Sequence, residues 1–178
     1  MRDGRLVIYG NGSMQFVARS ATPAPWSKYA DQITSIVVET GVASIANKAF
    51  SSCSNVTTVT VADTVTSIGS AAFAGCESLT DVTFTGDAPT IAENSFQDVD
   101  VKIHYPEDNT TWNEAVGQDF GGDVTWNTYV IKTTPMYRLY NPNADCGSHH
   151  YTNSIEERGF LVSVGWIFED IGWFGMLK

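Results

Sequence analysis

Residues 33–55 read ITSIVVETGVASIANKAFSSCSN, residues 56–78 read VTTVTVADTVTSIGSAAFAGCES, and residues 79–100 read LTDVTFTGDAPTIAENSFQDVD. Side chains of one chemical type return every 23 residues in these segments. The matching sets are Ile36, Val59 and Val82; Val38, Val61 and Phe84; Ile45, Ile68 and Ile91; and Phe50, Phe73 and Phe96. A fixed period of this length is typical of a solenoid, in which one repeat must stack on its neighbours to bury its apolar side. Because solenoids mostly present surface, the sequence favours a binding protein or scaffold over an enzyme.

Every repeat has the same expected order of elements. In residues 56–78, the alternation TTVTV predicts a short strand with Val59 and Val61 facing inward. A polar turn follows, and then a second extended piece that ends at Ile68. The stretch SAAFAGC favours a single helical or 3-10 turn in which Phe73 packs inward. Each buried Val, Ile or Phe contributes about 1.5–3 kcal/mol, so three stacked repeats bury enough apolar surface to be viable.

The flanking segments are expected to cover the two ends of the stack. The opening GRLVIYGNGSM predicts a strand that runs into a turn, and Trp26 lies just before the first repeat, where a large aromatic side chain would cover the raw end. After the repeats, VKIHY predicts one more strand over residues 101–105. Trp112 and Trp126 are then expected to close the C-terminal end, and Asn113 is expected to cap a short helix.

The composition changes again from about residue 132, where Tyr, His, Phe and Trp become dense and the period is lost. Ser154, followed by Glu156 and Glu157, predicts the start of a capped helix, and Gly165 predicts its end. Strands are expected at residues 137–140, 149–152 and 166–168. The result is a compact α+β unit near the lower size limit for independent folding. The expected domains are an N-terminal cap (1–32), repeats of 23-residue period (33–105), a C-terminal cap and linker (106–132) and a small aromatic-rich α+β module (133–178).

Three groups of motifs in the first part of the chain agree with one another. They are TVTSIGSAAFAGCESLTDVTF with its upstream copy, the opening GRLVIYGNGSM with PWSKYADQITSI, and the closing HYPEDNTTW. Together they resemble the BspA-like class of leucine-rich repeats, found chiefly in bacterial cell-surface proteins and in some protozoan surface proteins. The resemblance covers roughly residues 4–112. It implies a right-handed, β-rich solenoid engaged in adhesion or protein recognition, with a host or bacterial surface protein as the partner.

The tail carries a second set of motifs: YRLYNPN, HHYT, ER followed two residues later by Leu, and GW followed by GWFG. These are similar to an uncharacterised repeat module of Gram-positive secreted proteins, which is often attached to cell-wall hydrolases and surface proteins and usually occurs in several copies. The resemblance implies an alternative function, an accessory module that targets a cell-wall hydrolase to glycan or peptidoglycan.

Composition limits the possible partners and the location. A formal net charge of −10 argues against a nucleic-acid partner, which would require a basic stripe. No run of about 18 apolar residues is present, so we expect no membrane insertion by this chain. The N-terminal MRDGRLVIYG lacks the apolar stretch of a signal peptide. We therefore expect a piece of a larger exported protein, extracellular or on the surface of a Gram-positive bacterium, whose signal and anchor lie elsewhere.

Two of the three cysteines, Cys53 and Cys76, occupy the same place in consecutive repeats. Stacked repeats lie about 4.8 Å apart, a distance that permits a disulfide. Stacked side chains point in parallel rather than at each other, however, so we expect two buried free thiols. Cys146, in a polar loop, is expected to react readily.

Outward-facing strand positions offer one candidate binding surface. They alternate with the buried positions and would form a ladder on one face of the solenoid. The ladder consists of Ser35, Val37, Thr58, Thr60, Asp81, Thr83, Lys102 and His104. Thr and Ser are also simply good strand residues, and none of these positions carries the Trp, Tyr or Arg that usually anchors an interface. The alternative interpretation is therefore that this face of the solenoid binds no partner.

The tail offers the second candidate surface. Tyr140, His150, Tyr151 and Trp173 are candidates for stacking on a glycan, although a small unit also needs aromatic residues for its core. Adjacent His149 and His150 would point to opposite faces of a strand and make a poor metal clamp. The sequence shows no paired catalytic carboxylates, no nucleophile with its base and no phosphate-binding loop. We expect no catalysis, no metal and no cofactor.

Overall fold

The computed structural model describes residues 3–14, 24–130, 133–144 and 148–176. The chain divides into two compact units, Met1–Val130 and Ile131–Lys178. The first unit is a β-solenoid of about four turns, and the second is a small α+β module, as the sequence predicts. None of the described helices is long and apolar enough to cross a membrane.

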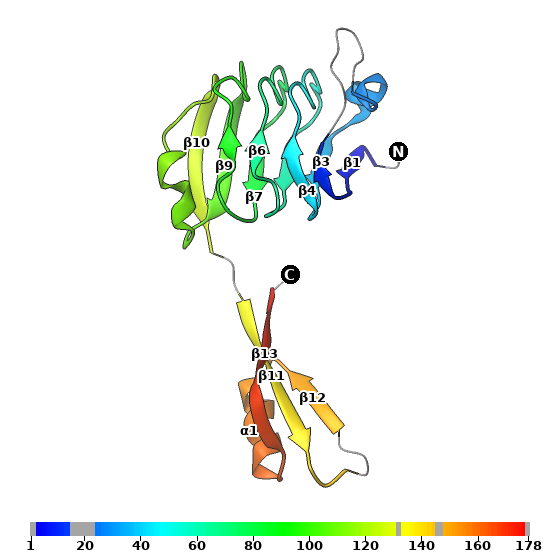
Figure 1. Ribbon diagram of the computed structural model, residues 1–178, viewed down its shortest axis with the longest axis vertical. Coiled ribbons are helices and arrows are strands. Elements are labelled where there is room, and N and C mark those ends of the chain that lie inside the picture. The colour runs from blue at the N-terminus through cyan, green and yellow to red at the C-terminus, as the bar shows by residue number, and fades with distance from the viewer. Residues whose placement is uncertain (1–2, 15–23, 131–132, 145–147, 177–178) are drawn as a thin grey trace. The chain divides into compact units, whose positions relative to one another are not determined.

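A parallel six-stranded sheet forms one wall of the solenoid, as Figure 1 shows. In spatial order its strands are β1 (Arg5–Ile8), β3 (Ser35–Val38), β5 (Thr58–Val61), β7 (Asp81–Phe84), β9 (Asp100–Pro106) and β10 (Asp123–Tyr129). The register follows the period, because Ile36 pairs with Val59 and Val59 with Val82. Strand β10 extends the sheet beyond the strand expected at residues 101–105, and the 23-residue period does not predict it.

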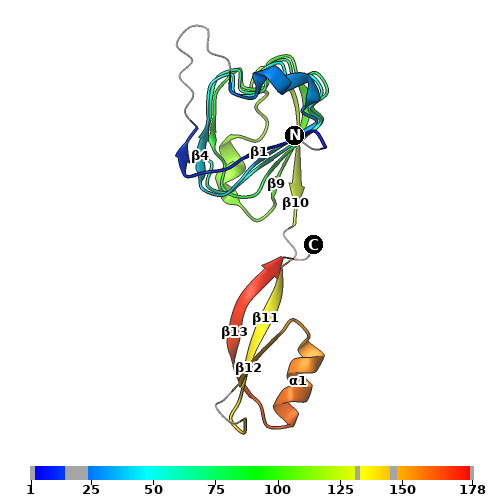
Figure 2. The same ribbon diagram turned by 90° about the vertical axis from the view of Figure 1, so that its right-hand side faces the viewer.

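A second parallel sheet forms another wall, and Figure 2 shows β4 and β10 on opposite sides of the coil. Its strands are β2 (Gly12–Ser13), β4 (Val42–Ile45), β6 (Ser67–Ile68) and β8 (Thr90–Ile91), in that order. This sheet ends at β8, whereas the larger sheet continues through β9 and β10. The two sheets therefore end at different levels of the stack.

A second set of residues, the aromatic ladder, consists of rings stacked through the interior of the solenoid. Phe50, Phe73 and Phe96 are fully buried, and neighbouring rings lie 5.5 and 5.2 Å apart between centroids. Trp26 continues the aromatic ladder, with its ring centroid 5.5 Å from that of Phe50. Its indole N–H donates a 2.8 Å hydrogen bond to the Ala49 carbonyl. Trp26 thus covers the first repeat.

At the C-terminal end, Trp112 is buried against Phe84, with centroids 4.9 Å apart, and donates to the Gly86 carbonyl at 3.0 Å. The short 3-10 helix η2 (Thr110–Glu114) carries this tryptophan. Its cap is Asn109, whose side chain accepts from the Thr111 N–H, so the expectation that Asn113 caps a helix is wrong. Asn113 lies inside η2 because the helix begins one turn earlier.

In the module, strands β11 (Thr133–Asn141), β12 (Ser148–Thr152) and β13 (Ile167–Met176) form an antiparallel sheet with β11 in the centre. Helix α1 (Ile155–Ser163) is capped as predicted, since the Ser154 hydroxyl accepts from the Glu157 N–H at 3.1 Å. Leu139 is fully buried, but the helical Phe160 is 64% exposed. The apolar residues of the helix are therefore less buried than their pattern suggests.

Candidate binding surfaces

The ladder residues of the larger sheet all share its outer face. The strand register aligns them in two rows, Ser35, Thr58, Asp81 and Lys102 in one, and Val37, Thr60, Thr83 and His104 in the other. Alternation along each strand sends their neighbours Ile36, Val59 and Val82 into the core. The structure thus brings together every ladder position that the sequence identifies.

Within this ladder, the side chains of Asp81 and His104 contact each other. The His104 Nε2 lies 2.8 Å from Asp81 Oδ1, and the Thr80 hydroxyl donates to Asp81 Oδ2 at 2.8 Å. The hydrogen bond from His104, followed by that from Thr80, lowers the pKa of Asp81. Lys102 is in register beside Asp81 and adds a smaller lowering. These contacts stabilise the ionised Asp81 carboxylate on this face.

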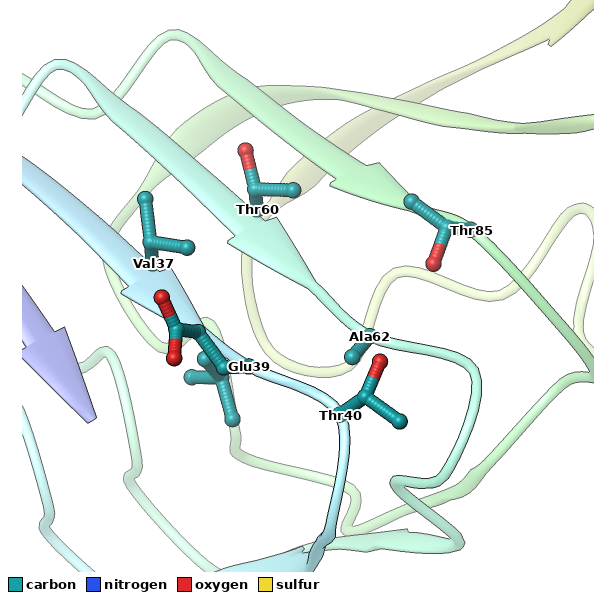
Figure 3. A pocket seen from close by; sticks show the side chains of 7 residues that line it. Val37, Glu39, Thr40, Thr60, Ala62 and Thr85 are labelled. Atoms are coloured by element: carbon teal, nitrogen blue, oxygen red, sulfur yellow. The ribbon is translucent and has the colours of Figure 1, made fainter. Parts of the chain in front are cut away.

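A shallow hollow of about 380 Å³ opens on the same face beside the ends of β3 and β5 (Figure 3). Its lining residues are Val37, Val38, Glu39, Thr40, Thr60, Ala62 and Thr85. Glu39, Ala62 and Thr85 are equivalent positions of successive repeats, 23 residues apart. Because the middle one is alanine, the side chains on either side stand above it. This hollow was not predicted from the sequence, although an alanine between larger residues at one repeat position is a signal for it.

The module presents a different kind of surface on the face of its sheet that carries Tyr140 and Tyr151. The register pairs Tyr140 with His149 and Arg138 with Tyr151, so all four side chains share one face. The Tyr140 and His149 rings lie 5.3 Å apart between centroids. Tyr151 is 44% exposed.

Charged groups accompany these two tyrosines. Glu169 Oε2 lies 2.9 Å from Arg138 Nε and 3.2 Å from His149 Nε2. The Arg138 Nε–H is not aligned on an acceptor in the described part of the chain, so the contact with Glu169 is an ion pair rather than a directed hydrogen bond. We refer to Arg138, Tyr140, His149, Tyr151 and Glu169 as the tyrosine face.

The other two predicted module residues lie apart from this face or outside the described side chains. His150 points to the opposite side of β12, where its Nε2 lies 3.1 Å from Glu157 Oε1 and its ring meets Trp166 edge-on. The hydrogen bond from Thr152, and then that from His150, lowers the pKa of Glu157. The side chain of Trp173 is outside the described residues. Tyr140 and Tyr151 therefore share a face that His150 does not.

The two repeat cysteines are buried free thiols, as predicted. Burial raises the pKa of Cys53 to about 11, and burial together with the neighbouring Cys53 raises that of Cys76 to about 12. The Cys76 thiol donates to the Phe50 carbonyl at 3.2 Å. Both thiols are thus packing groups of the solenoid interior. Cys146 lies outside the described residues.

Comparison with known proteins agrees with the repeat geometry. The family model described as the BspA type leucine rich repeat region matches residues 27–116 with six copies. The chain belongs to the BspA-type leucine-rich-repeat family. Repeat solenoids of this kind commonly present extended surfaces for binding.

Two further comparisons concern the rest of the chain. Residues 95–176 of this BspA-type protein match the model of a domain of unknown function (DUF5648). A crystal structure of a leucine-rich repeat protein from Eubacterium ventriosum is similar, with 29% sequence identity and a TM-score of 0.45. The alignment covers 80% of this chain and 45% of that protein, so the chain spans less than half of its length. Comparison with curated proteins finds no match.

Proposed function

We propose that this BspA-type solenoid is a non-catalytic scaffold for adhesion or protein recognition, part of a larger exported protein at the surface of a Gram-positive bacterium. Its partner would be a host or bacterial surface protein. The observation that carries the proposal is the hollow on the outer face of the larger sheet. The repeat class, which is found chiefly in bacterial surface proteins, supports the location.

The hollow suits a side chain of a protein partner. The side chains of Val37, Thr60 and Ala62 supply small apolar contacts, and the Glu39 carboxylate stands at the edge (Figure 3). A partner side chain with an apolar stem and a donor at its tip, such as Lys or Arg, could bury the stem and pair with Glu39. The paired Asp81 and His104 are weaker anchors, because a partner would first have to break their contact.

The proposal is tested by binding of the intact chain to immobilised host-cell and bacterial surface proteins, set against purified peptidoglycan. Ala62→Gln fills the hollow, and Glu39→Gln removes its charge. Glu77→Gln, at an exposed turn away from this face, is the control with the same charge change as Glu39→Gln. Both hollow variants should weaken binding to a surface protein, while the control should bind like the wild type. Equal binding by all four proteins would exclude the hollow as the recognition site.

The tyrosine face favours a second function, a glycan- or peptidoglycan-targeting accessory module of a cell-wall hydrolase. Sugar rings stack on aromatic faces, and Arg, His and Glu side chains hydrogen-bond to sugar hydroxyls. By analogy with aromatic pairs, each ring would contribute about 0.5–1.5 kcal/mol beyond burial. Two rings, Tyr140 and Tyr151, therefore predict weak binding by one copy.

Isothermal titration of the intact chain with soluble cell-wall fragments tests this second function. Tyr140→Ala and Tyr151→Ala should each reduce the heat of binding. Phe160→Ala removes an exposed aromatic ring of the helix and serves as the control. If the wild-type chain gives no heat, or if the control loses as much as the tyrosine variants, the tyrosine face is not a glycan site.

A further inference from the structure

The C-terminal end of the solenoid is closed on two walls but open on a third. On the wall of the larger sheet, β9 and β10 follow β7. On the wall of turns, the Phe96 N–H donates to the Phe120 carbonyl at 3.1 Å and the Asp98 N–H to the Gly121 carbonyl at 3.2 Å. The chain there forms the same kind of backbone hydrogen bonds as a further repeat would. On the wall of the smaller sheet, the described strands end at β8 and no fifth strand follows.

The free edge of β8 carries backbone groups that point away from the sheet. Thr90 donates its N–H to the carbonyl of Thr66, just before β6, at 2.9 Å, and Ala92 donates to that of Ile68 on β6 at 3.1 Å. Successive residues of a parallel strand bond to opposite sides, so the N–H and C=O of Ile91 face outward. Among the described residues, none forms a hydrogen bond with either group.

A groove of about 280 Å³ runs along this edge, between β8 and the segment that contains η2. Its lining residues are Ala88, Pro89, Thr90, Ile91, Thr111, Glu114, Ala115, Gln118 and Phe120. The Ala88 N–H at one end is already bound by the Thr111 hydroxyl at 2.9 Å. Ile91 is therefore the residue at which this edge has a donor and an acceptor available to a guest.

The charge around the groove identifies the kind of guest. Glu114 lines the groove, and Asp87, Glu93 and Asp119 adjoin the lining segments in sequence. Residues 87–93 and 109–122 contain no Lys or Arg. A second copy of this chain, with a formal net charge of −10, would be repelled. A basic segment would be attracted.

We propose that the β8 edge binds an extended, Lys- or Arg-bearing peptide segment of a partner protein as a fifth strand of the smaller sheet. The guest backbone bonds to the Ile91 N–H and C=O, which is β-strand addition. A basic side chain pairs with Glu114, and small apolar side chains contact Ala115 and Phe120. Pro89 removes one edge donor and restricts the pairing to a short segment. This site is independent of the hollow and of the tyrosine face.

The test uses a fluorescein-labelled acetyl-Thr-Val-Lys-Val-Lys-Val-Thr amide titrated into the intact chain by fluorescence anisotropy. Glu114→Lys should raise the dissociation constant about tenfold or more, the equivalent of about 1.4 kcal/mol. Glu77→Lys, which changes net charge equally outside the groove, should leave it unchanged. Hydrogen exchange of the Ile91 amide in the wild-type chain should slow when the peptide is bound. A peptide N-methylated at alternate residues should bind more weakly than its parent.

Several outcomes would overturn the proposal. Equal weakening by Glu77→Lys, or unimpaired binding of the N-methylated peptide, would show charge attraction without strand addition. No binding to the wild-type chain, or no protection of the Ile91 amide, would exclude this edge. Dimerisation of the chain through the same edge in sedimentation would assign it to a second copy. Because Glu39→Gln should not affect this peptide, failure of the hollow and failure of the β8 edge can be told apart.

Discussion

Replacing Phe73 with alanine should destabilise the solenoid more than any exposed substitution, because this ring is the middle of the aromatic ladder. Phe73 is fully buried, and its ring lies 5.5 Å from that of Phe50 and 5.2 Å from that of Phe96. Alanine at this position removes both ring contacts and leaves a cavity that neighbouring repeats, tied by the parallel sheets, cannot easily fill.

The size of the effect follows from these contacts. Replacing a buried Phe with Ala typically costs about 3–5 kcal/mol through lost burial and the residual cavity. Each stacked ring pair adds about 0.5–1.5 kcal/mol, and Phe73 makes two of them. The measured range for Phe-to-Ala already includes lost ring contacts, so two stacked pairs place Phe73→Ala at its upper end, about 4–5 kcal/mol. Since a domain is stable by only about 5–15 kcal/mol, such a loss would leave the variant close to unfolding.

Urea unfolding followed by far-ultraviolet circular dichroism measures this loss. Tyr9→Ala is the matched control, because Tyr9 is an aromatic residue of the same unit with 79% of its surface exposed. The control should change the free energy of unfolding by no more than about 0.5 kcal/mol. A loss below about 1 kcal/mol for Phe73→Ala, or a loss no larger than the control's, would refute the reasoning that stacked rings hold the repeats together.

Two further predictions concern the cysteines and the charged pair. Burial raises the pKa of Cys53 to about 11 and that of Cys76 to about 12. A thiol reagent at neutral pH should therefore label Cys146 alone in the folded chain and all three cysteines after unfolding, as counted by mass spectrometry. A native Cys53–Cys76 crosslink would contradict this prediction. The pKa of Asp81 is lowered chiefly by the hydrogen bond from His104, so the stability it contributes is present above its ordinary value of 3.8 and is lost as the pH falls through the lowered pKa. Asp81→Asn should lower the free energy of unfolding by at most about 1 kcal/mol at pH 6, because the pair is partly exposed. It should also flatten the acid limb of a plot of stability against pH. An unchanged acid limb would show that the Asp81–His104 pair does not contribute to stability.

The repeated part of the fold was predictable because stacking imposes its period on the sequence. Ile36, Val59 and Val82 recur every 23 residues, and the structure pairs them in register on adjacent strands. The same logic predicted the outer face, since residues beside a buried strand position must face out. The Ser154 cap was predictable for a different reason, because a serine three residues before a glutamate is a local signal.

Features that depend on non-repeated contacts could not be foreseen. Strand β10 has no counterpart in the period, and its place is set by pairing with β9. Asn113 was expected as the cap, but η2 begins one turn earlier with Asn109 as its cap and Trp112 packed against Phe84. Predicting the hollow requires knowledge of which side chains lie beside Ala62 in space.

The tyrosine face shows the same limit. Tyr140 and Tyr151 share a face because of the register between β11 and β12, and alternation along either strand alone does not specify this register. Alternation along a single strand did separate His149 from His150, as the structure also shows. Local alternation is thus readable from sequence, whereas the partner of each strand is not.

Recognition of a surface protein through the hollow is the central claim, and site-specific photocrosslinking tests it most directly. A benzophenone amino acid is placed at Ala62 in one protein and at Glu77 in another, and each is irradiated on intact host cells and on intact bacteria. We expect a discrete protein adduct from position 62 and none from position 77. Absence of an adduct from position 62 on every surface, or the same adducts from both positions, would contradict it.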